Sequence, residues 1–159
     1  MRQTERAFTL AEILIVVIIL AILAAITVSQ FQAGPIEARS VNLRENLSKI
    51  RMQLALYRQQ HNGYPSAANI EQQMTEFTNL QGDCASARST EFRYPPLLEQ
   101  MPGNPITGSK QVRTTNDPSI TTPHAAADGG WWYNEATGHF HADLTDSHVD
   151  PDGIRYCAY

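Results

Sequence analysis

The chain has 159 residues, a formal net charge of −4 and 18% charged residues. Its length fits one folded domain plus a short additional segment. The acidic balance argues against general binding to nucleic-acid phosphates, so a nucleic-acid partner is not expected. The sequence contains no nucleophile elbow, no phosphate-binding glycine loop and no local signature of a catalytic triad, so we expect no enzyme activity.

The most prominent stretch is the apolar run from Phe8 to Val28. No polar side chain occurs between Ile13 and Ile26. A helix of about 20 residues can cross a hydrocarbon core of about 30 Å, and a single span must be helical to satisfy its peptide groups. We therefore predict a transmembrane helix over residues 8–28. Glu12 is the only ionisable residue of this run, and a charge at that depth indicates a function with a partner.

A short basic segment, residues 1–7, precedes the apolar run. Arg2 and Arg6 outnumber Glu5, and positive residues before an apolar run hold that end in the cytoplasm. We therefore expect the rest of the chain to lie on the other side of the membrane. An ordinary secretory signal is cleaved after its apolar core, whereas the small residue here, Ala7, comes before it. Cleavage at Ala7 would leave the whole helix on the mature chain.

A basic leader, a small residue, the sequence FTLAE and a long apolar helix resemble the N-terminal signal of type IV pilins and type II secretion pseudopilins. The resemblance implies that a prepilin peptidase cleaves between Ala7 and Phe8 and methylates the new amine of Phe8. It also implies that Glu12 matches the family's glutamate and makes the assembly contact with a neighbouring subunit. The family usually has glycine at the position of Ala7. Alanine is also small, but we expect it to be cleaved more slowly than glycine. The competing interpretation is a plain signal anchor with an incidental glutamate.

The resemblance implies a structural subunit of a type II secretion pseudopilus or a type IV pilus-like fibre. The implied partners are copies of itself and other pilin-like subunits, the prepilin peptidase, a membrane platform protein and, through it, an assembly ATPase. The subunit would be stored as a single-pass protein of the bacterial inner membrane, with a cytoplasmic N-terminus and a periplasmic head. The alternatives are a minor tip pilin that acts as a binding or adhesion module, and a membrane-tethered enzyme. Secretion or pilus use, and major or minor subunit, stay open at this point.

A second helical stretch is predicted over about residues 36–60. Its apolar residues recur at spacings of four and three, which is typical of an amphipathic helix with one buried stripe. The stripe consists of Leu43, Leu47, Ile50, Leu54 and Tyr57. We expect the stripe to contact the core of a folded domain. A kink or weak turn is expected before it at Gly34-Pro35, and a helix stop after it at His61-Asn62-Gly63.

The remaining sequence predicts short elements. We expect Ser66 to cap a short helix that carries Ile70, Met74 and Phe77. Residues 110–130 are rich in Thr, Pro, Ala, Asn and Asp and are predicted to form a surface loop. Residues 131–133 and 139–144 are typical of a β-hairpin, in which Phe140, Ala142 and Leu144 share one face. Trp132 is the expected core anchor against the long helix.

The predicted fold class is therefore α+β, in which a long N-terminal helix packs on a small antiparallel β-sheet, as in pilins. The helix has a transmembrane half and an amphipathic half. The predicted organisation is a leader peptide at residues 1–7, a transmembrane and assembly helix at 8–28, an amphipathic helix at 29–62 that continues into the globular domain, and a periplasmic globular head at 63–159.

The two cysteines, Cys84 and Cys157, both follow the predicted span and so lie in a compartment that permits disulfides. Two cysteines allow a single intrachain pairing. We expect this bridge, and two buried free thiols are the alternative.

Two further groups of residues are candidate metal sites. Three histidines, His139, His141 and His148, lack a convincing zinc spacing, and a solvated strand face explains them better. The acidic loop from Asp143 to Asp152 offers oxygen ligands of the kind that calcium prefers. The main pseudopilin of type II secretion has a calcium loop near its C-terminus, but the spacing here differs. We expect no metal and no cofactor, with calcium in this loop as the less favoured alternative.

Overall fold

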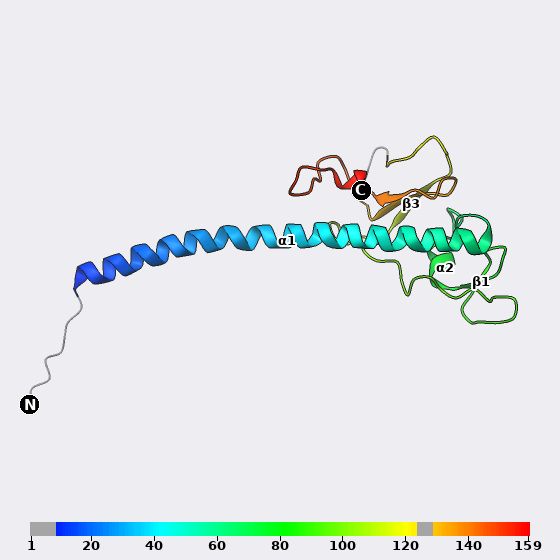
Figure 1. Cartoon of the computed structure of the whole chain (residues 1–159), viewed down its shortest axis with the longest axis horizontal. Coiled ribbons are helices and arrows are strands. Elements are labelled where there is room, and N and C mark those ends of the chain that lie inside the picture. Colours follow the sequence, from blue (N-terminus) through cyan, green and yellow to red (C-terminus); the bar gives the residue numbers. More distant parts are fainter. Residues whose placement is uncertain (1–8, 124–128) are drawn as a thin grey trace, which may run out of the picture. The chain divides into compact units, whose positions relative to one another are not determined.

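A computed structural model describes residues 9–123 and 129–159, with the side chains of residues 26–35 left out of the description (Figure 1). The helices are α1 (Leu10–His61), α2 (Ile70–Thr75) and the 3₁₀ helix η1 (Tyr156–Ala158). The strands are β1 (Phe77–Thr78), β2 (Cys84–Ala85), β3 (Val112–Thr115), β4 (Trp131–Asn134) and β5 (Phe140–Ala142). The chain divides into two compact units, residues 1–37 and 38–159. We call the second unit the head.

Helix α1 covers both predicted helical stretches without an interruption. The predicted weak turn at Gly34-Pro35 is therefore wrong, whereas the alternative, a kink within the helix, stays a prediction. A proline removes one hydrogen bond and crowds the preceding turn, and the turns on both sides keep the backbone helical here. The predicted stop is confirmed, because α1 ends at His61 and Asn62 adopts the left-handed conformation, with φ of 58°.

No helix within the described residues is long and apolar enough to cross a membrane. The transmembrane helix over residues 8–28 is thus not confirmed and stays a prediction, as do the boundaries at residues 7, 28 and 62. The packing boundary observed in the chain lies between Glu37 and Ala38.

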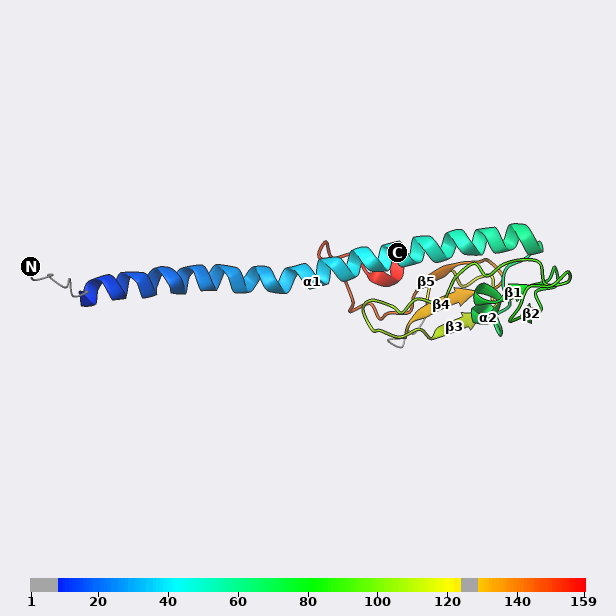
Figure 2. The ribbon, with the colours of Figure 1, turned by 90° about the horizontal axis from the view of Figure 1, so that it is seen from below.

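The head is built on the predicted stripe of α1. All five stripe residues are at most 2% exposed, which confirms the expected core contact. They pack with Met74 of α2 and with Trp131, Tyr133 and Phe140 of the sheet. Figure 2 shows β4 and β5 beside the later part of α1, with β3 on the far side of the sheet. The helix becomes stable in this position because the sheet covers the apolar stripe and excludes water from it.

The three-stranded sheet has the order β3-β4-β5. Strands β4 and β5 pair antiparallel, which confirms the predicted hairpin, whereas β3 and β4 pair parallel. The prediction of a purely antiparallel sheet is therefore wrong for β3, which lies in the segment predicted as loop. Its residues, Val112–Thr115, carry no local turn or hairpin signal, because a parallel partner is always distant in sequence. A separate two-stranded antiparallel sheet joins β1 and β2.

Two local predictions for the head were wrong by a small register shift. Trp131, rather than Trp132, belongs to the core cluster that contains the α1 stripe, and it donates its indole N–H to the Pro102 carbonyl at 2.7 Å, although Trp132 is also buried, at 3% exposed. Trp132 lies on the opposite face of β4, with its ring 5.9 Å from that of His141. The residue that precedes α2 is Asn69 instead of Ser66, because α2 begins only at Ile70.

Candidate assembly site

The first turn of α1 holds the one acidic side chain of the apolar run. Thr9 precedes the helix, and Glu12 is its third residue. One carboxylate oxygen of Glu12, Oε2, accepts hydrogen bonds from both the backbone N–H and the hydroxyl of Thr9, each at 2.9 Å. The Glu12 N–H donates in return to the Thr9 hydroxyl at 3.2 Å. This reciprocal arrangement is a capping box, which satisfies backbone donors that a helix start leaves unpaired.

The capping box leaves half of the Glu12 carboxylate unused. Within the described residues, its second oxygen, Oε1, accepts no hydrogen bond. The sequence signal for the box was present, since Thr9 and Glu12 stand three residues apart at the start of an apolar run. The position of Glu12 in an apolar run predicted a contact between subunits, whereas its local partner, Thr9, was not predicted.

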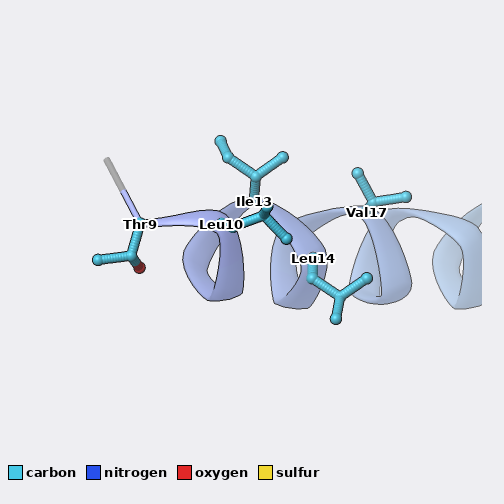
Figure 3. A pocket seen from close by; sticks show the side chains of 5 residues that line it. All are labelled: Thr9, Leu10, Ile13, Leu14 and Val17. Carbon is cyan, nitrogen blue, oxygen red and sulfur yellow. The ribbon is translucent and has the colours of Figure 1, made fainter. Parts of the chain in front are cut away.

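The helix surface next to Glu12 is apolar and open. Thr9, Leu10, Ile13, Leu14 and Val17 line a groove of about 460 Å³ (Figure 3). The aliphatic residues from Ile13 to Leu23 are each at least 50% exposed. Large exposed apolar surfaces mark sites of contact with a membrane or another protein. Ile13, one predicted end of the span, is 53% exposed, and the side chain of Ile26 lies outside the described part.

The predicted processing site falls outside the described residues. Both Ala7 and Phe8 precede the first described position, Thr9. Cleavage, methylation of Phe8 and the contact of its amine with Glu12 therefore stay predictions.

The two cysteines do not form the predicted bridge. Both are free thiols, and they belong to separate elements, β2 and η1. The Cys84 sulfur lies 3.7 Å from the Gly82 carbonyl, whereas the Cys157 sulfur lies 3.5 Å from a carboxylate oxygen of Asp146. The pairing was inferred from the compartment and an even count, and these carry no information about distance. A disulfide needs Cα atoms within about 7 Å, and the fold places β2, which holds Cys84, and η1, which holds Cys157, in different parts of the head (Figure 2).

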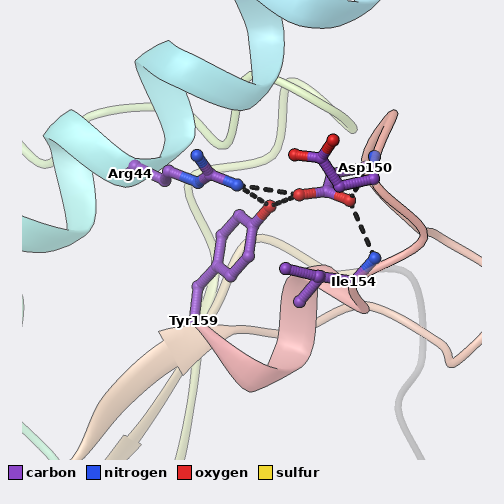
Figure 4. Close-up of polar contacts among 5 residues, drawn as sticks. Arg44, Asp150, Ile154 and Tyr159 are labelled. Carbon is purple, nitrogen blue, oxygen red and sulfur yellow. Dashed lines mark hydrogen bonds and ion pairs between the residues drawn. The ribbon is translucent and has the colours of Figure 1, made fainter.

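Asp150 is buried, and it fixes the C-terminal segment against α1 (Figure 4). Its carboxylate accepts from Arg44 at 2.8 Å and from the Tyr159 hydroxyl, and Arg44 also donates to that hydroxyl at 2.6 Å. The Ile154 N–H donates to its other oxygen at 2.8 Å. The hydrogen bond from Tyr159 is the main cause that lowers the pKa of Asp150, and the backbone N–H groups and Arg44 act in the same direction.

Two other acidic residues of the predicted calcium loop, Asp143 and Asp146, also have basic partners. Asp143 is buried and accepts from Arg113 at 2.8 Å, and Asp146 pairs with Arg155 at 3.0 Å. In the part of the chain that the structure describes, no three His, Cys, Asp or Glu side chains are grouped as metal ligands. The buried carboxylates of Asp143 and Asp150 thus hold the head together through arginine, and calcium binding stays untested.

The histidines fall into different environments. The exposed ring of His139 lies 6.2 Å from that of His141, on the strand face that the sequence analysis predicted for both. His141 is half-buried beside Arg51, and His148 is part of the turn that begins at Thr145. Burial is the main cause that lowers the pKa of His141, and the Arg51 charge adds to it.

Comparison with known proteins points to the N-terminal segment. Residues 2–28 match the family model of the prokaryotic N-terminal methylation motif. The chain is also 37% identical over 65 residues to type II secretion system core protein G of Pseudomonas aeruginosa. That match covers 41% of this chain and 46% of the relative, so the chain spans less than half the length of the relative. No solved structure matches the chain. The chain therefore carries a prepilin-type N-terminal methylation motif and is similar in part to a core protein of type II secretion.

Proposed function

We propose that the protein is a structural subunit of a type II secretion pseudopilus or a related pilus-like fibre. One observation carries the proposal: the methylation motif at residues 2–28 includes the first part of α1, where the large aliphatic side chains from Ile13 to Leu23 stay at least half exposed in the single chain. The head, in contrast, buries its own core. A chain that folds one part and leaves a long apolar helix uncovered needs a membrane or other subunits around that helix.

The proposed life of the subunit has two stages. The apolar helix first anchors the chain in the bacterial inner membrane, with the head in the periplasm. A prepilin peptidase then removes residues 1–7 and methylates Phe8, and the subunit moves into the fibre through contacts between copies of α1. The assembly ATPase and the platform protein would supply the force, since the proposed role of this chain is structural.

Glu12 gives the fibre its register in this proposal. A carboxylate in an apolar layer is costly unless a cation or hydrogen-bond donor reaches it. Thr9 satisfies one oxygen, and the other accepts nothing among the described residues. The methylated amine of Phe8 from an adjacent subunit would donate to that second oxygen. The pair of unlike charges then both attracts the two helices and fixes their relative position.

Processing is tested by the mass of the protein extracted from membranes. We expect a chain that begins at methylated Phe8. Ala7→Leu should block cleavage because of its bulk, whereas the control Ala7→Gly should be cleaved at least as fast as wild type. A retained Met1 in the wild-type protein, or a start beyond Ala25, would overturn the processing step.

The role of Glu12 requires variants that separate its charge from its capping function. Glu12→Gln keeps an oxygen that can cap the helix but removes the charge. Thr9→Ala removes the cap but keeps the charge. We expect Glu12→Gln to insert and be cleaved normally but to enter fibres poorly beside wild-type subunits, and Thr9→Ala to enter them nearly normally. If Glu12→Gln assembles as well as wild type, or if only Thr9→Ala fails, Glu12 is a helix cap and not the assembly contact.

A further inference from the structure

The side chain of Asp150 is fully buried, and both of its carboxylate oxygens accept hydrogen bonds (Figure 4). Oδ1 accepts from the backbone N–H groups of Asp152 and Ile154 at 2.9 and 2.8 Å. Oδ2 accepts from Nη2 of Arg44 at 2.8 Å and from the Tyr159 hydroxyl. An ionised carboxylate offers about four lone-pair positions. These four donors therefore leave no position for a further ligand.

The negative charge of Asp150 is balanced by Arg44, a residue of α1. A buried carboxylate needs such a cation, because burial penalises its charged form. Arg44 donates to the carboxylate and also to the Tyr159 hydroxyl, and its guanidinium lies 4.5 Å from the centre of the Tyr159 ring. We call these three residues, Arg44, Asp150 and Tyr159, the arginine clamp. The clamp joins α1 to the segment of the chain that follows β5.

Asp143, the second buried carboxylate of the acidic loop, is occupied in a similar way. Nε and Nη2 of Arg113, a residue of β3, donate to its two oxygens at 2.8 and 2.5 Å. A guanidinium bound in this bidentate way covers both oxygens on the side from which a metal ion would approach. The two buried carboxylates of the loop thus each face an arginine, and the two arginines come from different elements of the head.

These contacts do not suit calcium, the metal that the family resemblance suggests for this loop. Calcium takes about six to eight oxygen ligands at about 2.3–2.6 Å. To reach Asp143 or Asp150 it would have to displace a guanidinium, and two cations at such a distance repel each other strongly in a buried site. The other acidic residues, Asp146 and Asp152, are exposed, and Asp146 pairs with Arg155 at 3.0 Å. The acidic loop therefore does not fit a calcium site.

We propose that Arg44 takes the place of a bound metal cation at Asp150, so that the arginine clamp holds the segment after β5 on α1 without calcium. The guanidinium belongs to the chain itself, so its presence beside Asp150 does not depend on the ions of the surrounding medium. A calcium site, in contrast, stabilises a fold only while calcium exceeds its dissociation constant. This inference concerns the folding of the head and does not rest on the proposed function.

Thermal unfolding of the detergent-solubilised full chain tests the independence from calcium. Both tryptophans, Trp131 and Trp132, lie in β4, so their fluorescence reports on the head. We expect the Tm in excess EGTA, a calcium chelator, to equal the Tm in excess calcium chloride within about 1 °C. A site that calcium fills at about a hundred times its dissociation constant would raise the Tm by roughly 10 °C. A Tm that is several degrees higher in calcium than in EGTA overturns the proposal.

Variants of Arg44 test whether its positive charge holds the segment. Arg44→Gln keeps a hydrogen-bond donor but leaves Asp150 buried without a cation, and we expect the Tm in EGTA to fall by about 5 °C or more. The matched control Arg39→Gln removes the same charge from an exposed arginine of α1 that has no partner among the described residues. It should shift the Tm by less than about 2 °C. Equal Tm values for the two variants overturn the proposal.

Two milder variants separate the charge from the other contacts of the clamp. Arg44→Lys keeps a cation and should retain more of the Tm than Arg44→Gln. Tyr159→Phe keeps the ring and the balanced charge but loses the hydroxyl, so it should also lower the Tm less than Arg44→Gln. If Arg44→Gln does not fold, a folded Arg44→Lys supports the proposal. An Arg44→Lys variant that also fails to fold, or a Tyr159→Phe variant less stable than Arg44→Gln, overturns it.

Discussion

The two parts of α1 solve opposite problems with similar residues. From Ile13 to Leu23 the aliphatic side chains point in every direction, and each is at least half exposed. From Leu43 to Tyr57 the five residues of the buried stripe all lie on one side of the helix, and each is at most 2% exposed. A stripe needs a partner on one side only, and the head supplies it. A helix that is apolar all round needs apolar surroundings on all sides, which a single small domain does not provide. The spacing of the apolar residues, more than their number, therefore indicates whether a helix is covered by its own chain or needs apolar surroundings from outside it.

The largest expected effect comes from truncating the stripe. Leu47→Ala should lower the free energy of unfolding of the head by about 2–5 kcal/mol, because it removes a buried side chain and leaves a cavity. Ile18→Ala is the matched variant in the exposed part and should change the unfolding of the head by less than about 0.5 kcal/mol. Chemical denaturation of the detergent-solubilised full chain, followed by tryptophan fluorescence, measures both. Equal effects of the two variants would break the distinction between the two parts of α1.

The second effect is a loss of head stability at acidic pH. The last residue of α1, His61, stacks on Tyr57 at 3.9 Å, donates from Nδ1 to the Tyr57 carbonyl and accepts at Nε2 from the Thr78 hydroxyl. Burial lowers the pKa of His61, although the bond to the carbonyl opposes this shift, and burial lowers the pKa of His141 in the same way. The unfolded chain therefore binds more protons than the folded head below a pH of about 6.5.

The sign of this effect follows from the lowered pKa values. Stability from the neutral histidines is fully present above a pH of about 6.5 and is lost as the pH falls toward the folded pKa, by at most about 1.4 kcal/mol per pH unit and per histidine. Thermal unfolding between pH 7.5 and 5 should show this slope. His61→Gln should flatten it. A head that is equally stable at pH 5 and 7.5 would contradict the expected role of both rings.

The smallest effect concerns the thiols, which both lie in the head. Burial is the main cause that raises the pKa of Cys84, and the charges of Glu76 and Asp83 raise it further. Burial likewise raises the pKa of Cys157, and Asp146 acts in the same direction. Protein isolated without reductant should contain two free thiols that iodoacetamide modifies more slowly at pH 7.5 than it modifies a small model thiol. The rate should increase as the pH approaches 9. A peptide linked through Cys84 and Cys157 in a non-reducing mass map would contradict this expectation.

The sequence predicted those features whose partners are close along the chain. The buried stripe of α1, its stop at His61 and the β4-β5 hairpin each depend on periodicity or on turn residues within a few positions. The sequence failed where the partner is distant. Strand β3 pairs in parallel with β4 across a long connection, and no local pattern marks that pairing. The separation of Cys84 from Cys157 is likewise a property of the whole fold.

Glu12 and the acidic loop show the same difference between partners that are close along the chain and partners that are distant, with one exception. Glu12 was recognised by its charge in an apolar run, but its capping partner, Thr9, was overlooked although the spacing of the box is local. In the acidic loop, the arginine partners of Asp143 and Asp150 could not be predicted, because they come from remote positions. Arg44 reaches Asp150 across 106 residues, and Arg113 reaches Asp143 across 30.

Arg51 affects how the heads of neighbouring molecules avoid joining through their β-sheets. Strand β5 is the last strand of its sheet, so its free side is an edge that could recruit a strand from another molecule. Arg51 donates from Nε and Nη2 to the Phe140 carbonyl on β5, at 2.9 and 2.7 Å. The guanidinium thus occupies a hydrogen-bonding position at which an intruding strand would begin to pair. A side chain of α1 thereby protects the sheet against aggregation by strand addition, even where a fibre would hold many copies at high local concentration.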